Sequence, residues 1–428
     1  MRIVDLIEKK RDGGTHTRAE LEALILGDVP DYQLAAWLMA VCWRGMQPDE
    51  TAALTAVMAA SGEQLDLSAI GRAVADKHST GGVGDKTSLV VMPLVAACGV
   101  PVGKMSGRGL GFTGGTIDKL ESFAGIRVDL PAGDFVRQLG DVGIVITGQS
   151  VDLAPADGRL YALRDVTGTV PSLPLIASSV MSKKLAAGAH VIVLDVKAGS
   201  GAFMRDPHAA HALAEAMVSI GTAAGRKMAA VVSDMSQPLG RAVGNALEVR
   251  EALETLSGNG PAEFTAFTLE LATTIVELAG GRPGEVGSAL RSGAGLASLR
   301  RMVEAQGGAA AAFDDLSRLP SARFQEPLLA ESDGYVARLD ALTVARASNL
   351  LGAGRERKGD PVDLAVGVVL EAKIGDRVER GQPLLVVHAN DSHRLDEAQR
   401  LLLTGIELSP RPVQAPPLIL RRVSAAGA

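Results

Sequence analysis

The sequence has few cysteines and no strong net charge, and each shortage excludes a class of protein. Only two cysteines, Cys42 and Cys98, occur in 428 residues, and both lie in apolar surroundings. Two isolated thiols exclude a disulfide framework and a cysteine-based metal cluster, and they favour buried thiols in a reducing compartment. The net charge of −6 gives no global attraction to nucleic acid or to acidic membranes.

Targeting and membrane segments are also missing. Residues 1–5 carry charges where a signal peptide would need an apolar stretch. The longest apolar run, residues 89–102, is too short to cross a bilayer and is interrupted by two prolines and a glycine. These patterns predict a cytoplasmic protein without membrane contact.

What the sequence does contain is typical of a packed α/β protein. The apolar fraction is 47%, and 49 glycines indicate many tight turns. The length favours two to three domains with a sizeable core. Helical patterns dominate the first 62 residues, where Thr17 and Glu20 form a capping box. From residue 73 short apolar strands alternate with helices, which predicts a mainly parallel sheet with its ligand site at the carboxyl ends of the strands.

These patterns divide the chain into three parts. We predict a small all-helical lobe from residues 1–65 and 157–188, and a larger mainly parallel α/β sheet domain from residues 70–152 and 190–320. For residues 330–428 we predict an α+β half-barrel module that resembles lipoyl and biotinyl carrier domains. Because no Met-Lys-Met hairpin accompanies it, we interpret it as a structural or assembly module; a carrier or binding module is the alternative.

Two glycine-rich loops stand out between residues 76 and 121. The first reads Asp76-Lys77-His78-Ser79-Thr80-Gly81-Gly82-Val83-Gly84-Asp85-Lys86-Thr87-Ser88, and the second follows Lys104 and Met105 and extends from Ser106 to Glu121. Glycines let backbone N–H groups converge on an anion, and the neighbouring lysines and hydroxyls supply further donors. Two such loops on neighbouring strands predict a phosphate held from two sides.

Two common nucleotide motifs do not explain these loops. Residues 81–87 resemble a Walker loop, but Asp85 stands where that loop needs a glycine. Residues 109–114 fit the pattern G-x-G-x-x-G, but too few residues lie between this pattern and Pro131 to form the helix and the next strand of a dinucleotide fold.

The whole stretch resembles the signature of the thymidine phosphorylase and pyrimidine-nucleoside phosphorylase family. The resemblance is most visible in Ser106-Gly107-Arg108-Gly109-Leu110-Gly111, in Thr113-Gly114-Gly115-Thr116-Ile117-Asp118-Lys119-Leu120-Glu121, and in Lys197-Ala198-Gly199-Ser200-Gly201-Ala202-Phe203-Met204. It covers essentially the entire chain, including the C-terminal module.

The resemblance implies a set of site residues. Phosphate is held in the family by residues that match Lys77, Ser79, Ser88, Ser106 and Thr116, and we include Lys104 in the same predicted set. The pyrimidine base is held by residues that match His78, Arg164, Ser179 and Lys183. Ser179 and Lys183 are also four residues apart on a predicted helix, so they share one face. His78, Arg164 and Lys183 are the predicted catalytic residues.

The implied activity is reversible phosphorolysis of uridine, thymidine or deoxyuridine to the free base and the (deoxy)ribose 1-phosphate. The expected partners are a pyrimidine nucleoside, phosphate and a second copy of the chain in a homodimer, without nucleic acid. Phosphate is a co-substrate, and no metal or organic cofactor is expected to carry the chemistry. The alternatives are a strict thymidine phosphorylase and an enzyme similar to anthranilate phosphoribosyltransferase, which would need Mg²⁺.

Two departures from the family pattern are visible. Phe112 stands where many relatives carry histidine. Relatives with a pattern like Leu239, Ala242 and Glu251 hold a monovalent metal ion there, using a loop glycine that matches Gly84 and a hydroxyl residue two positions later. That later position is Lys86 in this sequence, so we predict that its ammonium replaces the ion.

Overall fold

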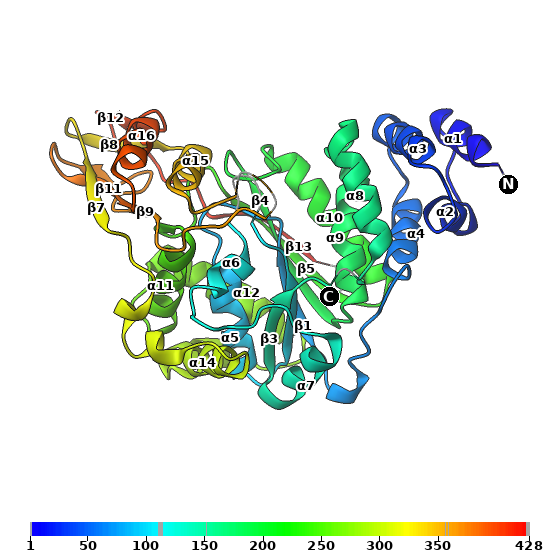
Figure 1. Cartoon of the computed structure of the whole chain (residues 1–428), viewed down its shortest axis with the longest axis horizontal. Helices are drawn as coiled ribbons and strands as arrows, with labels where there is room; N and C mark the ends of the chain where they lie inside the picture. The colour runs from blue at the N-terminus through cyan, green and yellow to red at the C-terminus, as the bar shows by residue number, and fades with distance from the viewer. Residues whose placement is uncertain (1, 110–113, 151, 356, 358, 425–428) are drawn as a thin grey trace.

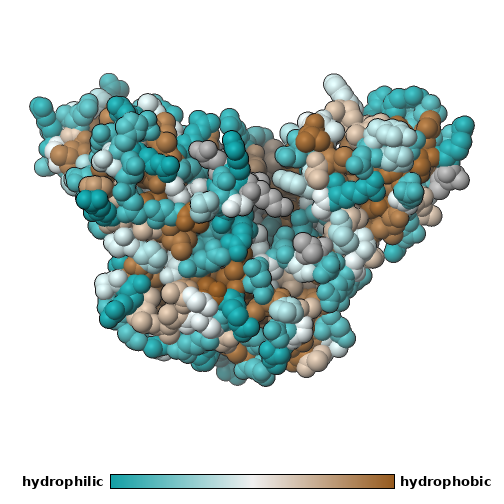
Figure 2. All heavy atoms as spheres, viewed as in Figure 1, coloured by the Kyte–Doolittle hydropathy of each residue, from teal (hydrophilic) through white to brown (hydrophobic). Residues whose placement is uncertain are grey.

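A central α/β domain carries a helical lobe on one side and a small β-rich module on the other (Figure 1). The computed structural model describes residues 2–109, 114–150, 152–355, 357 and 359–424. The two outer parts rise from the central domain like the arms of a V, and the surface between them is hollowed (Figure 2).

The helical lobe combines two separate segments of the chain. It consists of α1 (Ile3–Arg11), α2 (Arg18–Ile25), α3 (Asp31–Arg44), α4 (Pro48–Ala59), α8 (Pro155–Thr167) and α9 (Leu173–Ala186). The predicted capping box is present, since the Thr17 hydroxyl accepts from the Glu20 N–H and the Glu20 carboxylate accepts from the Thr17 N–H. Leu160 and Leu175 from the later segment share one apolar core with Trp37, which is why the insert returns to the N-terminal helices.

The central domain contains a six-stranded sheet in the order β13-β5-β4-β1-β2-β3. The parallel strands are β1 (Ala75–Ser79), β2 (Val102–Ser106), β3 (Ile144–Gly148), β4 (Val191–Ala198) and β5 (Lys227–Asp234). The domain's helices are α5 (Thr87–Ala97), α6 (Thr116–Leu120), α7 (Ala132–Val142), α10 (Pro207–Ala223), α11 (Asn245–Leu256), α12 (Ala262–Leu278), α13 (Glu285–Arg291) and α14 (Ala294–Ala305). This is the parallel sheet that the alternating sequence pattern predicts.

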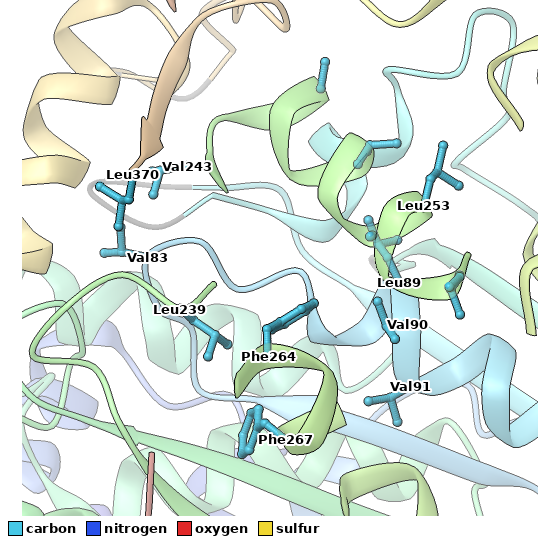
Figure 3. Packing of buried hydrophobic residues seen from close by; sticks show 14 of the residues in the cluster. Val83, Leu89, Val90, Val91, Leu239, Val243, Leu253, Phe264, Phe267 and Leu370 are labelled. Atoms are coloured by element: carbon cyan, nitrogen blue, oxygen red, sulfur yellow. The ribbon is translucent and has the colours of Figure 1, made fainter. Parts of the chain in front are cut away.

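Both faces of this sheet are covered. Val191 and Val193 of β4 lie in the large core with α5 and α12, whereas Ile192 and Leu194 lie in a second core with α10. Successive side chains of a strand point to opposite faces, so an apolar run is expected in a strand that is buried on both sides. Figure 3 shows part of the large core, where Leu89, Val90 and Val91 of α5 lie near Leu253.

The C-terminal module is built from two small antiparallel sheets and two helices. Its elements are β7 (Phe324–Leu329), β8 (Gly334–Leu339), α15 (Ala341–Leu351), β9 (Gly367–Leu370), β10 (Arg377–Val378), β11 (Pro383–Ala389), α16 (Ser392–Leu403) and β12 (Ile406–Ser409).

Two strands cross the predicted boundary between this module and the central domain. Strand β6 (Ala242–Val243) comes from the α/β segment and pairs with β9, and β13 (Ile419–Ser424) pairs antiparallel with β5. An edge strand leaves N–H and C=O groups unpaired, and β13 satisfies those of β5. The module that begins near residue 330 is therefore not separate from the central domain in its strand pairing, because each of the two contributes a strand to a sheet of the other. Within the described residues, no helix is both long and apolar enough to cross a bilayer.

Candidate active site

The two glycine-rich loops leave the sheet side by side. Strands β1 and β2 are parallel neighbours, so their carboxyl ends, and the loops that follow, lie at the same edge of the sheet. A cavity of about 170 Å³ opens between the loops. The amino end of α5 also lies at this cavity through Ser88, and a helix amino terminus favours a negative charge.

Most of the predicted phosphate residues line this cavity. Four hydroxyl residues and one lysine reach it from four elements, β1, α5, β2 and α6; they are Ser79, Ser88, Lys104, Ser106 and Thr116. Hydroxyls and an ammonium around a space of this size suit a tetrahedral oxyanion, which accepts several hydrogen bonds at once. His78 and Phe203 line the same cavity.

Lys104 carries an unusual charge balance. It is buried on β2, and its ammonium donates to the backbone carbonyl of Lys77 at 2.6 Å. Burial, together with the nearby charge of Lys184, lowers its pKa from 10.5 to about 7, against the opposing effect of Asp76. A bound anion raises the pKa of such a lysine, so the lysine regains its full positive charge when the anion binds.

Asp85 is a wall residue that sequence reasoning did not single out as functional. Its carboxylate accepts hydrogen bonds from the hydroxyls of Ser79 and Thr87. Burial opposes its ionisation, but the charges of Lys77, Lys197 and Lys119 hold the pKa of Asp85 well below its usual range. The carboxylate is thus ionised and holds the hydroxyl of Ser79 in the cavity wall and that of Thr87 behind it. The sequence contained no signal for this role beyond the failed Walker match at that position.

Lys77 is the one predicted phosphate residue that is not among the described residues lining the cavity. Its side chain is fully buried, and its ammonium donates to Thr87 and lies 3.4 Å from the Asp195 carboxylate. Asp195 also pairs with Lys197 at 2.7 Å. Lys77 therefore contributes positive charge from below the first loop, and direct contact with phosphate stays a prediction.

A buried carboxylate binds the start of the second loop. Asp118 accepts from the N–H of Gly109 at 2.6 Å and from Arg355 of the C-terminal module at 2.8 Å. Next to it, Lys119 reaches the Asp85 carbonyl at 2.7 Å and the Glu248 carboxylate at 2.8 Å, which ties the two loops together. Phe112, the noted departure from the family pattern, lies outside the described residues.

The predicted base residues lie on the helical lobe. Arg164 of α8 is buried and donates to the backbone carbonyls of Thr169, Val170 and Leu175 at 3.4, 2.7 and 3.1 Å. Burial lowers the pKa of this guanidinium. Arg164 is thus held by backbone carbonyls of its own lobe.

Ser179 and Lys183 share one face of α9, as their spacing predicts. Ser179 is buried, and the Lys183 ammonium is half-buried and lies 2.7 Å from the Asp157 carboxylate. The neighbouring Lys184 fixes the carboxyl end of α9 to the sheet, since its ammonium lies 2.7 Å from Asp76 and 3.2 Å from the Met105 carbonyl.

His78 lies between the two groups of residues. Burial lowers its pKa well below the usual range, and the charges of Lys184, Lys104, Lys77 and Lys183 lower it further. The ring is therefore neutral at neutral pH and can donate one N–H.

Family models match three segments of the chain. "Glycosyl transferase family, helical bundle domain" matches residues 4–62, "Glycosyl transferase family, a/b domain" matches residues 71–283, and "Pyrimidine nucleoside phosphorylase C-terminal domain" matches residues 335–409. Among solved structures, anthranilate phosphoribosyltransferase from Thermus thermophilus aligns with a TM-score of 0.57. The alignment covers 71% of this chain and 100% of that one at 20% identity, which confirms the fold alone.

Curated relatives match over the full length. The pyrimidine-nucleoside phosphorylase of Geobacillus stearothermophilus is 51% identical over 434 residues, covering 99% of this chain and 100% of the relative. That of Staphylococcus epidermidis strain ATCC 12228 is 49% identical, with coverage of 98% and 99%. The predicted resemblance is confirmed, and the chain belongs to the pyrimidine-nucleoside phosphorylase family.

Proposed function

We propose that this protein catalyses the reversible phosphorolysis of pyrimidine nucleosides, giving the free base and the (deoxy)ribose 1-phosphate. The observation that carries the proposal is the cavity between the two glycine loops, which presents hydroxyls and a low-pKa lysine to an oxyanion. It lies on a chain whose full-length relatives are named for this activity.

The phosphate half of the reaction needs positioning rather than covalent catalysis. Ser88, Ser106 and Thr116 orient the dianion, and Ser79 joins them when its hydroxyl turns from Asp85 to the ligand. Lys104, with the charge of Lys77 behind it, offsets the charge of the dianion. A phosphate oxygen then attacks C1′ of the sugar while the bond from C1′ to the pyrimidine nitrogen breaks. Holding the two reactants in line supplies much of the rate.

The bond electrons move into the pyrimidine ring, which becomes anionic. Arg164 and Lys183 face this developing charge, and neutral His78 donates to a ring carbonyl oxygen. Donors placed where charge appears only in the transition state lower the barrier, by about 2.7–4 kcal/mol for a single donor. Phosphate is the co-substrate, and this scheme uses no metal or organic cofactor.

The two groups of residues lie on different lobes, so catalysis requires the helical lobe to approach the sheet edge. Closure would bring the base within reach of Lys183, whose ammonium would then leave Asp157 for the base. It would also exclude water from the reacting atoms.

The direct test is release of uracil from uridine and of thymine from thymidine, with and without inorganic phosphate and without Mg²⁺. We expect release that depends strictly on phosphate, and arsenate should replace phosphate because the cavity binds a tetrahedral oxyanion. Release only from thymidine would instead support a strict thymidine phosphorylase. A requirement for Mg²⁺ and a diphosphorylated sugar would contradict the proposal and favour chemistry like that of anthranilate phosphoribosyltransferase.

We further propose that the protein is a homodimer formed through α3 and α8. Aromatic side chains at the two ends of α3 are open to solvent, with Trp43 82% and Tyr32 74% exposed, and Val166 of α8 is exposed as well. Large exposed apolar side chains on the same lobe are a feature of many interfaces. Light scattering should give twice the chain mass, and Trp43→Glu should shift the protein to monomer. A monomer at micromolar concentration would contradict this.

A further inference from the structure

Outside the anion cavity, a second cluster of buried charges lies where the first glycine loop meets the loop after β5. The ammonium of Lys86 lies 2.9 Å from the Leu239 carbonyl, 2.9 Å from the Ala242 carbonyl and 2.8 Å from the Glu251 carboxylate. It is 1% exposed, and the Phe264 ring lies 5.2 Å away. Figure 3 shows Leu239 beside Phe264 in this region.

A second lysine binds the same loop from the C-terminal module. Lys373 is buried, and its ammonium donates to the carbonyls of Pro238 and Gly240 at 2.6 and 3.1 Å. Glu251 in turn accepts from the N–H groups of Arg241 and Ala242. The two ammoniums thus occupy four carbonyls of residues 238–242.

The donor set around Lys86 is the kind that a hard monovalent cation takes, since carbonyl and carboxylate oxygens replace the water around such an ion. The family resemblance implies a monovalent metal ion at this position. Here the residues do not fit one, because the Lys86 ammonium already makes those contacts. A second cation placed close to this buried ammonium would be repelled by it with little screening from water, and the ammonium of Lys373 adds to the repulsion.

The position of Lys86 in the chain gives this contact a structural consequence. It is the residue before α5, two positions after Gly84, whose backbone has a φ of +71° and passes so close to Leu239 that a Cβ would lie 2.6 Å from its carbonyl oxygen. It is also directly followed by Thr87, whose hydroxyl bonds to Asp85 in the wall of the anion cavity. Fixing Lys86 therefore fixes the first glycine loop.

We propose that Lys86 is a built-in cation that takes the place of a bound monovalent metal ion and makes this protein independent of potassium. The proposal goes beyond the proposed function, because it concerns the stability of a loop and holds whichever nucleoside is the substrate. Its test therefore includes thermal unfolding, which fails or succeeds independently of activity.

The experiment compares the unaltered protein with Lys86→Thr in potassium, sodium and choline chloride at equal ionic strength. For the unaltered protein we expect the same Tm and the same kcat/KM in all three salts. Threonine removes the ammonium, opens space and offers an oxygen. For Lys86→Thr we therefore expect a lower Tm in choline that potassium specifically raises, with a several-fold gain in kcat/KM.

A matched control is Lys86→Met, which fills the space but offers no oxygen ligand. We expect it to lose stability in every salt without potassium rescue. Strong potassium activation or potassium-specific stabilisation of the unaltered protein would overturn the proposal, as would a folded Lys86→Thr variant indifferent to the salt. If Lys86→Thr does not fold, the salt series on the unaltered protein still decides.

Discussion

The sheet side and the helical side of the proposed site hold their charged groups differently. On the sheet side, hydroxyls and Lys104 line an open cavity, and the carboxylate of Asp85 in its wall holds the hydroxyl of Ser79. On the helical side, Arg164 is bound to three backbone carbonyls and Lys183 is paired with Asp157. Most of the phosphate half is therefore preorganised, and only Ser79 has to exchange Asp85 for the ligand, whereas both Arg164 and Lys183 of the base half are engaged by the protein. The base half thus needs the larger rearrangement of side chains.

The strongest way to break the comparison is to release α9 from the sheet. In Lys184→Met the buried carboxylate of Asp76 loses its partner, which costs about 3–5 kcal/mol for a buried pair. We expect a large fall in the denaturant midpoint of the first unfolding transition. Lys183→Met is the control, because Lys183 is the next residue and is partly exposed. Its denaturant midpoint should decrease much less. Equal midpoints for the two variants would show that Lys184 does not anchor the lobe.

Removing the ammonium of Lys183 tests the base half directly. For Lys183→Ala we expect kcat/KM for the nucleoside to fall about 10²–10³-fold, as for loss of one transition-state donor. Steady-state kinetics with both substrates varied gives this value. Asp157→Asn, which keeps the ammonium but removes its partner, should lose less. Near-normal turnover of Lys183→Ala would mean that the residue only stabilises α8 against α9.

The phosphate half is tested by its hydroxyls. Ser88→Ala and Ser106→Ala each remove a hydrogen bond to a charged ligand, worth about 1.5–3 kcal/mol, so the KM for phosphate should rise at least about tenfold. The KM for nucleoside should change little. Ser178→Ala is the matched control, because that hydroxyl bonds to Thr51 within the helical lobe. A rise in nucleoside KM with phosphate KM unchanged would reverse the assignment of the two halves.

The smallest expected effect is the uptake of protons when phosphate binds. The pKa of Lys104 is about 7 in the free protein and 10.5 in an unfolded chain, so above pH 7 the folded protein is increasingly neutral at this site. Protonated Lys104 thus destabilises the fold, and this penalty lessens as the pH rises from 7 toward 10.5. A bound phosphate dianion favours the charged form, so binding near pH 8 should take up a fraction of a proton. Calorimetry in buffers of different ionisation enthalpy measures this uptake, and Lys104→Met should abolish it.

Contiguous motifs account for the part of the site that sequence reasoning predicted. Ser79, Ser88, Ser106 and Thr116 lie in or beside the two glycine loops, and neighbouring parallel strands bring such loops together whatever the surrounding packing. The i, i+4 spacing of Ser179 and Lys183 likewise fixes their common helix face. The predicted contacts of Lys86 with Leu239, Ala242 and Glu251 are present as well.

Side chains of β1 alternate between the two faces of the sheet, and this alternation, which is readable in the sequence, separates residues with different roles. Asp76 and His78 point to one face, toward Lys184 of α9, whereas Lys77 points to the other, toward Thr87 of α5. The period of two thus separates His78, a predicted base residue, from the lysine beside it.

The sequence by itself determined the family, the glycine loops and the hydroxyls, because these depend on residues that are close together in the chain. Only the tertiary structure decided which charges face the cavity and which support it from behind. Lys104 reaches the cavity and Lys77 is buried beneath it, although both were predicted to bind phosphate. The physical reason is that a buried ammonium must find partners. Beside the nearby Thr87, Lys77 meets the carboxylate of Asp195, and Lys373 meets the carbonyls of residues 238 and 240; these groups lie more than a hundred residues away in the chain.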